Sequence, residues 1–137
     1  LVQLKRYPSL IQRRYEIVKK YDEAMDAMHI EHIQHVSDVY HSSAHLYMIR
    51  IPGISVEQRN EIITKMAENG VATNVHYKPL PMMSGYKAFG WDINDFPNAY
   101  HLYHNEITLP LHTLLSDEDV EIVIQTLRST LEEMKLL

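Results

Sequence analysis

The stretch AHLYMIRIPGISVEQRNEIITKMAENG, residues 44–70, decides the fold. Residues 44–51 form a nearly continuous apolar and aromatic run ended by a proline and a glycine, which is typical of a central β-strand followed by a turn. Ser55 and Gln58 then have the spacing of a capping box, and the helix they begin ends at Gly70. The stretch therefore predicts one strand and then one helix, whose buried stripe is Val56, Ile63, Met66 and Ala67.

Upstream, the pattern predicts a helix over residues 9–28, because apolar side chains recur at helical spacing. Ser9 and Gln12 have the spacing of its capping box. A short strand is expected at residues 33–36, and a loop follows it before the central strand.

Downstream, residues 71–77 alternate as in a strand, and His76 lies on the side opposite to Val75 and Tyr77. Residues 78–81 must be irregular because two prolines remove two ladder donors. A loop then covers residues 82–95, with a short helix near 83–89.

The C-terminal part predicts a helix over residues 96–105, a strand at 107–109, and a last helix that Ser116 caps. Three acidic residues in its first turn favour the positive end of the helix dipole. Its expected buried stripe is Val120, Val123, Ile124, Leu127, Leu131 and Met134.

These elements predict an α+β fold, a two-layer sandwich in which helices pack on one face of a small, mainly antiparallel sheet. The length of 137 residues suits a single domain. The chain begins without Met and enters a helix pattern almost at once, so we expect the natural protein to continue upstream.

The composition excludes several classes of function. A net charge of −5 provides no basic surface for nucleic acid, and the absence of cysteine excludes disulfides and thiolate chemistry. No apolar run approaches the ~20 residues of a membrane helix, and no signal peptide is visible. We therefore expect a cytoplasmic protein. Its four glycines do not cluster, so there is no glycine-rich phosphate loop.

Nine histidines are many for this length. His29, His32 and His35 are three residues apart and would share one face of a continuous helix, where they could hold a metal ion. The segment resembles the end of a helix entering a strand, so the alternative is a polar, solvated connection. His101 and His104 have the same spacing and the same alternative.

Residues 76–81, HYKPLP, are the most informative candidate site. A strand end followed by two prolines is a stiff support for polar groups that contact a ligand. His76 can act as an acid or base near neutral pH, and Lys78 can neutralise an anion. In the alternative, Tyr77 belongs to the core, His76 binds a backbone carbonyl, and the prolines only shape a turn.

Several stretches together resemble the C-terminal region of the DegT/DnrJ/EryC1/StrS aminotransferases. The most specific is residues 69–80, which is close to the family pattern Gly-Ile-x-Thr-x-Val-His-Tyr-x-Pro-Leu. The others keep the family's order along the chain; they are residues 13–21, 43–50, 96–99, 107–112 and 115–116.

The resemblance implies the small domain of a fold-type I, pyridoxal-phosphate enzyme that works as a homodimer. Such enzymes pass an amino group, commonly from glutamate, to a nucleotide-linked keto-sugar by a ping-pong mechanism. The Schiff-base lysine and the acidic partner of the pyridine nitrogen belong to the large domain. The resemblance therefore implies that residues 9–28 lead out of a missing large domain. It also implies that this chain alone is inactive and holds no tightly bound cofactor.

For the site, the resemblance implies that His76 contacts the substrate and does not transfer the proton. Tyr77 and Lys78 are weaker candidates for the same cleft, and Lys78 occupies a variable position of the motif. His45 matches a histidine on the family's central strand, with a packed strand residue as the alternative. No catalytic residue and no metal ligand is assigned. The competing hypothesis is a freestanding α+β module that binds a ligand or a protein without catalysis.

Overall fold

Three short strands form an antiparallel sheet at the centre of this computed structural model, which describes all of residues 1–137. Their spatial order is β1 (Glu31–His32), β2 (Tyr47–Arg50), β3 (Glu106–Leu109). Paired residues of an antiparallel sheet lie on the same face, so the register determines which side chains share a surface. The pairs of β2 and β3 are Tyr47 with Leu109, Met48 with Thr108, Ile49 with Ile107 and Arg50 with Glu106.

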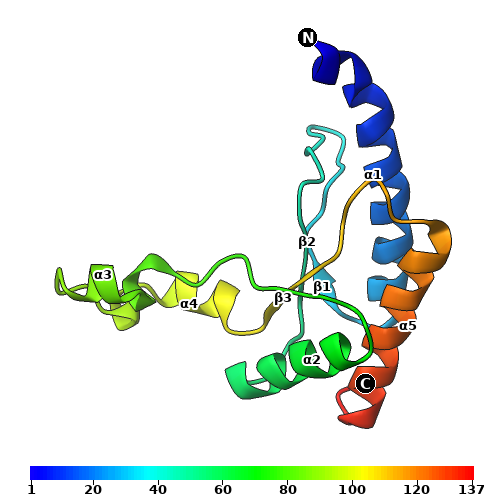
Figure 1. The fold of residues 1–137 in the computed structure, drawn as a ribbon. Coiled ribbons are helices and arrows are strands. Elements are labelled where there is room, and N and C mark those ends of the chain that lie inside the picture. The colour runs from blue at the N-terminus through cyan, green and yellow to red at the C-terminus, as the bar shows by residue number, and fades with distance from the viewer.

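Three long helices, α1 (Val2–Ala27), α2 (Val56–Glu68) and α5 (Asp117–Glu133), form the second layer. Figure 1 shows α1 and α5 side by side, with α2 crossing near the lower end of α5. All three contribute buried side chains to one cluster with the sheet. The predicted α+β class, with a small antiparallel sheet and helices packed against it, is confirmed.

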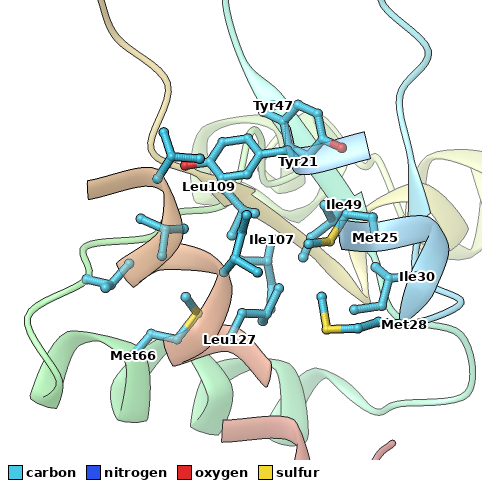
Figure 2. Packing of buried hydrophobic residues seen from close by; sticks show 14 of the residues in the cluster. Tyr21, Met25, Met28, Ile30, Tyr47, Ile49, Met66, Ile107, Leu109 and Leu127 are labelled. Atoms are coloured by element: carbon cyan, nitrogen blue, oxygen red, sulfur yellow. The ribbon is translucent and has the colours of Figure 1, made fainter. Parts of the chain in front are cut away.

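The core lies between these helices and one face of the sheet (Figure 2). Tyr21 of α1 packs on Tyr47 of β2, with ring centroids 4.9 Å apart, and its hydroxyl donates to the carbonyl of Pro110 at 2.8 Å. Leu127 of α5 and Ile107 of β3 are completely buried. Each such aliphatic side chain contributes about 1.5–3 kcal/mol when fully buried.

The predicted capping box at Ser55 and the predicted cap at Ser116 are both confirmed. The Ser55 hydroxyl accepts the backbone N–H of Gln58, and Ser116 accepts that of Asp119. The buried stripe of α5 is as predicted except that Thr130 replaces Met134, which is half-buried.

The predicted stripe of α2 is partly wrong. Met66 is buried as expected, but Ala67 is exposed, and Arg59 and Ile62 occupy the rest of the buried face. The apolar pattern favoured Ile63 because it follows only apolar residues. Arg59, which is polar, occupies one position of the true buried face, so that face was not recognised.

The predicted start of the first helix is wrong. α1 begins at Val2, Pro8 lies inside it, and the Ser9 hydroxyl donates to the carbonyl of Arg6 without capping a helix end. Pro8 deprives only the carbonyl of Leu4 of a helical donor, and Leu4 is exposed, so water can replace that bond.

The strand predicted at residues 33–36 lies at residues 31–32 in the structure, and the central strand is shortened to 47–50. Residues 33–46 form a loop closed by a single bridge between Val36 and His41. The side chain of His35 is buried in this loop and its Nδ1 contacts the Ser42 hydroxyl at 2.7 Å, so a side-chain contact replaces extended pairing.

The strand predicted at residues 71–77 is also wrong, because only Asn74 forms a bridge, with Thr108. Side chains satisfy the next two backbone donors. The Asn74 carbonyl oxygen Oδ1 accepts the N–H of Val75 at 2.8 Å, and a carboxylate oxygen of Glu106 accepts that of His76 at 2.9 Å. The peptide bond between His76 and Tyr77 is cis.

Residues 77–105, between His76 and β3, project from the body of the molecule and are called the arm (Figure 1). The expected short helix is α3 (Ser84–Lys87), and the helix expected at 96–105 is α4 (Pro97–Tyr103). Two 3₁₀ turns, η1 (Leu80–Met82) and η2 (Ile93–Asp95), complete the arm. No helix of the structure combines the length and apolarity needed to cross a membrane.

Candidate functional site

A pocket of about 280 Å³ opens on the side of the sheet opposite to the helices. It arises there because alternate side chains of a strand point to opposite faces. Tyr47 and Ile49 enter the core, so Met48 and Arg50 point the other way. The pocket is lined by Glu31, His32, Ile33, Met48, Arg50, His76, Leu102 and Glu106.

His76 is held at this pocket by two residues of β3. Its backbone N–H donates to Oε2 of Glu106 at 2.9 Å, and its ring Nδ1 lies 2.9 Å from the Thr108 hydroxyl. The Thr108 hydroxyl donates to Oε1 of the same carboxylate at 2.5 Å. Backbone and ring of His76 are therefore both tied to one buried carboxyl group, which fixes the ring's orientation.

Glu106 is an unusual strand residue, because an acidic residue is here only 4% exposed. Burial raises its pKa, whereas the hydrogen bonds from Thr108 and His76 and the nearby charge of Arg59 act in the opposite direction. A buried carboxyl group with a shifted pKa beside a pocket is a mark of a functional site.

Arg59 of α2 is 1% exposed and lies behind this carboxyl group. Its guanidinium donates to the backbone carbonyls of Tyr103 and Glu106 at 3.3 and 3.2 Å, and stacks over the Tyr103 ring at 4.8 Å. It therefore fixes the junction between the arm and β3, and with it the position of Glu106.

The rim of the pocket carries both signs of charge. Arg50 is paired with Glu31 of the neighbouring strand and faces Glu106 in the register of β2 and β3. With Leu102 and Met48 on the walls, the pocket offers donors, acceptors and apolar surface within a small volume. Such a combination suits a ligand that has several hydroxyl groups and apolar ring faces.

The four residues predicted as substrate contacts are not gathered in one place. His76 lines the pocket, and the Tyr77 ring stands edge-on to it with centroids 4.6 Å apart, although Tyr77 is 69% exposed. Lys78 is exposed beyond the pocket lining. His45 is exposed in the loop before β2 and does not line the pocket.

The three histidines of the metal hypothesis point in different directions. His29 is exposed at the end of α1, His32 lies 3.1 Å from carboxylate oxygens of Asp22 and Asp26, and His35 is buried against Ser42. No group of three histidine or acidic side chains in the chain could hold a metal ion.

A larger hollow of about 490 Å³ lies between the end of α1 and the C-terminal part of α5. Most of its lining is apolar. The smaller pocket is therefore the better candidate, because a buried carboxyl group, a histidine and an arginine converge there.

A model of the DegT/DnrJ/EryC1/StrS aminotransferase family matches residues 1–128. This chain belongs to the DegT/DnrJ/EryC1/StrS aminotransferase family. The spore coat polysaccharide biosynthesis protein SpsC of Bacillus subtilis is 34% identical over 134 residues, which cover 93% of this chain and 34% of SpsC. The UDP-4-amino-4,6-dideoxy-N-acetyl-beta-L-altrosamine transaminase of Campylobacter jejuni is 32% identical over 133 residues, covering 97% of this chain and 35% of that enzyme.

Solved structures of the family have the same fold. The PLP-form of Spr1654 from Streptococcus pneumoniae, assigned as a sugar aminotransferase, is 50% identical with a TM-score of 0.94. It covers 100% of this chain, which in turn spans 34% of Spr1654. The chain therefore spans about a third of the length of these DegT-family relatives.

The lining of this pocket does not by itself fit pyridoxal phosphate. No lysine lines the pocket beside His76, and no glycine-rich loop is available to bind a phosphate.

Three residues of the site were not predicted from the sequence: Glu106, Thr108 and Arg50. The predicted strand began at Ile107, one residue too late to include Glu106. Alternation along Glu106–Leu109 places Glu106 and Thr108 opposite to the apolar pair, and that signal could have identified them. Arg50 occupies the same face of β2 as Met48, for the same reason.

Proposed function

We propose that this chain is the C-terminal small domain of a pyridoxal-phosphate aminotransferase that transfers an amino group to a nucleotide-linked keto-sugar. The proposal includes glutamate as the amino donor. The main support is the match to the family over residues 1–128, together with the close likeness to Spr1654.

The names of relatives support the substrate class. The Campylobacter jejuni relative is a transaminase of a UDP-linked amino sugar, and a relative from Saccharopolyspora spinosa, 30% identical, is a dTDP-linked sugar 4-aminotransferase. Spr1654 is known in both PLP and PMP forms. The cofactor would supply the chemistry of amino transfer, and it would be held by the part of the protein beyond these residues.

Within that enzyme, we assign this chain the role of one wall of the substrate site. His76 is the principal contact, since it lines the pocket and its Nε2 has no protein partner. Tyr77 lies beside it, and Lys78 and His45 remain proposed contacts in the assembled enzyme. None of these residues is proposed to carry the proton of the reaction.

The proposed partners are a large domain of the same chain, which α1 would join to these residues, and a second subunit. The arm supports a partner of this kind because it exposes several aromatic rings to solvent. Those rings are Tyr77, Phe89, Trp91, Phe96 and Tyr100. The proposed location is the cytoplasm, where nucleotide sugars are the substrates.

The test is an assay of the protein that includes the large domain. With pyridoxal phosphate, glutamate and a UDP- or dTDP-linked 4-keto-sugar, it should form the amino sugar, detected by mass spectrometry. His76→Ala should raise KM for the sugar nucleotide, by about tenfold for one lost hydrogen bond. Leu114→Ala, a change at an exposed loop residue, is the control and should leave both constants unchanged.

Residues 1–137 alone should neither bind pyridoxal phosphate in a spectrophotometric titration nor transfer an amino group. Robust transamination by these residues would contradict the proposal. So would a longer protein that accepts no nucleotide-linked keto-sugar under these conditions.

A further inference from the structure

We propose that Glu106, acting through Thr108, sets which ring nitrogen of His76 carries the proton, and thereby makes Nε2 a hydrogen-bond acceptor for a substrate hydroxyl. Glu106 and Thr108 are then positioning residues. This inference deepens the proposed function and rests on it for the nature of the substrate.

A threonine hydroxyl has one proton to donate, and Thr108 donates it to Oε1 of Glu106 at 2.5 Å. The Thr108 oxygen can therefore only accept at the His76 ring, 2.9 Å away. Nδ1 of His76 must carry a proton to make that bond, so in the neutral ring Nε2 has the free lone pair.

The Glu106 carboxylate sets the direction of these hydrogen bonds. An ionised carboxylate only accepts hydrogen bonds, and both oxygens of Glu106 are used in this way. Oε2 accepts the backbone N–H of His76, and Oε1 accepts the hydroxyl of Thr108. The hydrogen bonds therefore run in one direction, from Nδ1 of His76 to the Thr108 hydroxyl and from that hydroxyl to the Glu106 carboxylate.

Charged and polar groups surround the Glu106 carboxylate. Arg59 of α2 donates to the backbone carbonyl of Glu106, and Arg50 of β2 is its cross-strand neighbour. Glu31 of β1 is paired with Arg50, and His76 lies on the remaining side. The Arg59 guanidinium favours the ionised form of Glu106, whereas burial raises the pKa of that carboxyl group.

The consequence is selectivity for a donor. With Nε2 as an acceptor, His76 favours a hydroxyl group of a sugar and disfavours a carbonyl or phosphate oxygen, which has no proton to offer. The other histidine of the pocket, His32, has its two ring nitrogens 3.1 Å from carboxylate oxygens of Asp22 and Asp26, so His76 is the histidine available to a ligand.

The direct test is the tautomer of His76 in protein labelled with ¹⁵N-histidine. Two-bond ¹H–¹⁵N correlations distinguish a protonated Nδ1 from a protonated Nε2, and His76→Gln identifies the signal among the nine histidines. The spectra are recorded above the pH range in which imidazoles titrate. The expected wild-type pattern is a protonated Nδ1.

Glu106→Gln should reverse the tautomer. The amide oxygen must take the place of Oε2 to accept the His76 N–H, which places the amide NH₂ opposite Thr108. Thr108 then accepts from Gln, donates to Nδ1, and leaves the proton on Nε2. Thr108→Val should remove the effect of residue 106 on the ring, and Thr108→Ser should restore the wild-type spectrum.

Thr130→Val is the matched control, since Thr130 is a buried threonine of α5 with no part in the pocket. It should leave the His76 signals unchanged. An unchanged tautomer in Glu106→Gln would overturn the proposal. If that variant does not fold, a wild-type tautomer in Thr108→Val overturns it instead.

Kinetics of the enzyme that includes the large domain supply the second readout. Thr108→Val should raise KM for the sugar nucleotide about tenfold with a smaller effect on kcat, and Thr108→Ser should reverse this. The tautomer is measured without substrate. A wild-type His76 protonated at Nε2 would therefore contradict this inference and leave the proposed function untouched. A wild-type enzyme without any aminotransferase activity would defeat the proposed function and leave the tautomer result standing.

Discussion

At the scale of single residues, several buried polar side chains are bound by partners distant in the chain. Tyr47 is completely buried and donates its hydroxyl to Asp22 of α1 at 2.7 Å; burial, followed by that contact, raises its pKa. His35 stacks on the Tyr47 ring at 5.7 Å and holds Ser42. Together they attach the loop of residues 33–46 to the first helix.

His35 should make the stability of the domain depend on pH. Burial lowers its pKa below the ordinary value of 6.5, while Asp22 acts to raise it and His32 to lower it. The folded state therefore prefers the neutral ring, and its stabilisation is fully present above pH 6.5. It should decline as the pH falls from there through the lowered pKa.

Urea unfolding of the wild type and His35→Gln at several pH values measures this effect. The free energy of unfolding of the wild type should fall on acidification relative to that of His35→Gln. The reason is that the unfolded wild-type chain takes up a proton on His35 at a higher pH than the folded chain, in which the ring is buried. His29→Gln, which changes an exposed histidine, should keep the wild-type dependence of the free energy of unfolding on pH. Equal slopes for His35→Gln and the wild type would contradict the prediction.

At the scale of elements, the helices with local capping signals are the ones whose limits were predicted well. α5 begins directly after Ser116, whose N–H and hydroxyl both contact Asp119, and these contacts lower the pKa of Asp119. α2 begins in the same way after Ser55. Ser9 has the same sequence pattern, yet it lies inside α1 and caps nothing.

Serine-to-alanine substitutions should separate real caps from apparent ones. Ser116→Ala should lower the free energy of unfolding by about 1 kcal/mol, because it removes the acceptor for a backbone donor at the start of α5. Ser9→Ala should change it by less than about 0.5 kcal/mol, since its bond lies on an exposed helix surface. Chemical denaturation of the two variants measures both values, and an equal loss in both would refute the assignment.

At the scale of the whole molecule, two parts project from the core: the arm and the first turns of α1 (Figure 1). Of the aromatic residues of α1, Tyr21 is buried in the core and Tyr15 is half-buried, so only Tyr7 is exposed. The exposed apolar surface of α1 consists mainly of Leu1, Val2, Leu4 and Tyr7. Surfaces of this kind favour association.

We expect residues 1–137 to associate with themselves through the start of α1. Sedimentation velocity should show an average mass that rises with concentration, and Leu4→Glu should reduce it by placing a charge on the contact surface. Phe89→Glu makes the same change on the arm and should have the smaller effect. A strictly monomeric wild type at high concentration would contradict the prediction.

What the sequence determined by itself is largely what neighbouring residues decide. The caps at Ser55 and Ser116, the apolar stripe of α5 and the α+β class follow from local spacing, and the resemblance of residues 69–80 pointed to the family that the comparison confirms. The tertiary structure alone decided how His76 is held. Its partner Glu106 is thirty residues away in the sequence. The Glu106 carboxylate accepts the backbone N–H of His76, in place of the backbone carbonyl that the predicted strand would have supplied. Pairing over such a distance depends on the whole sheet and on buried Arg59, and no local pattern contains it.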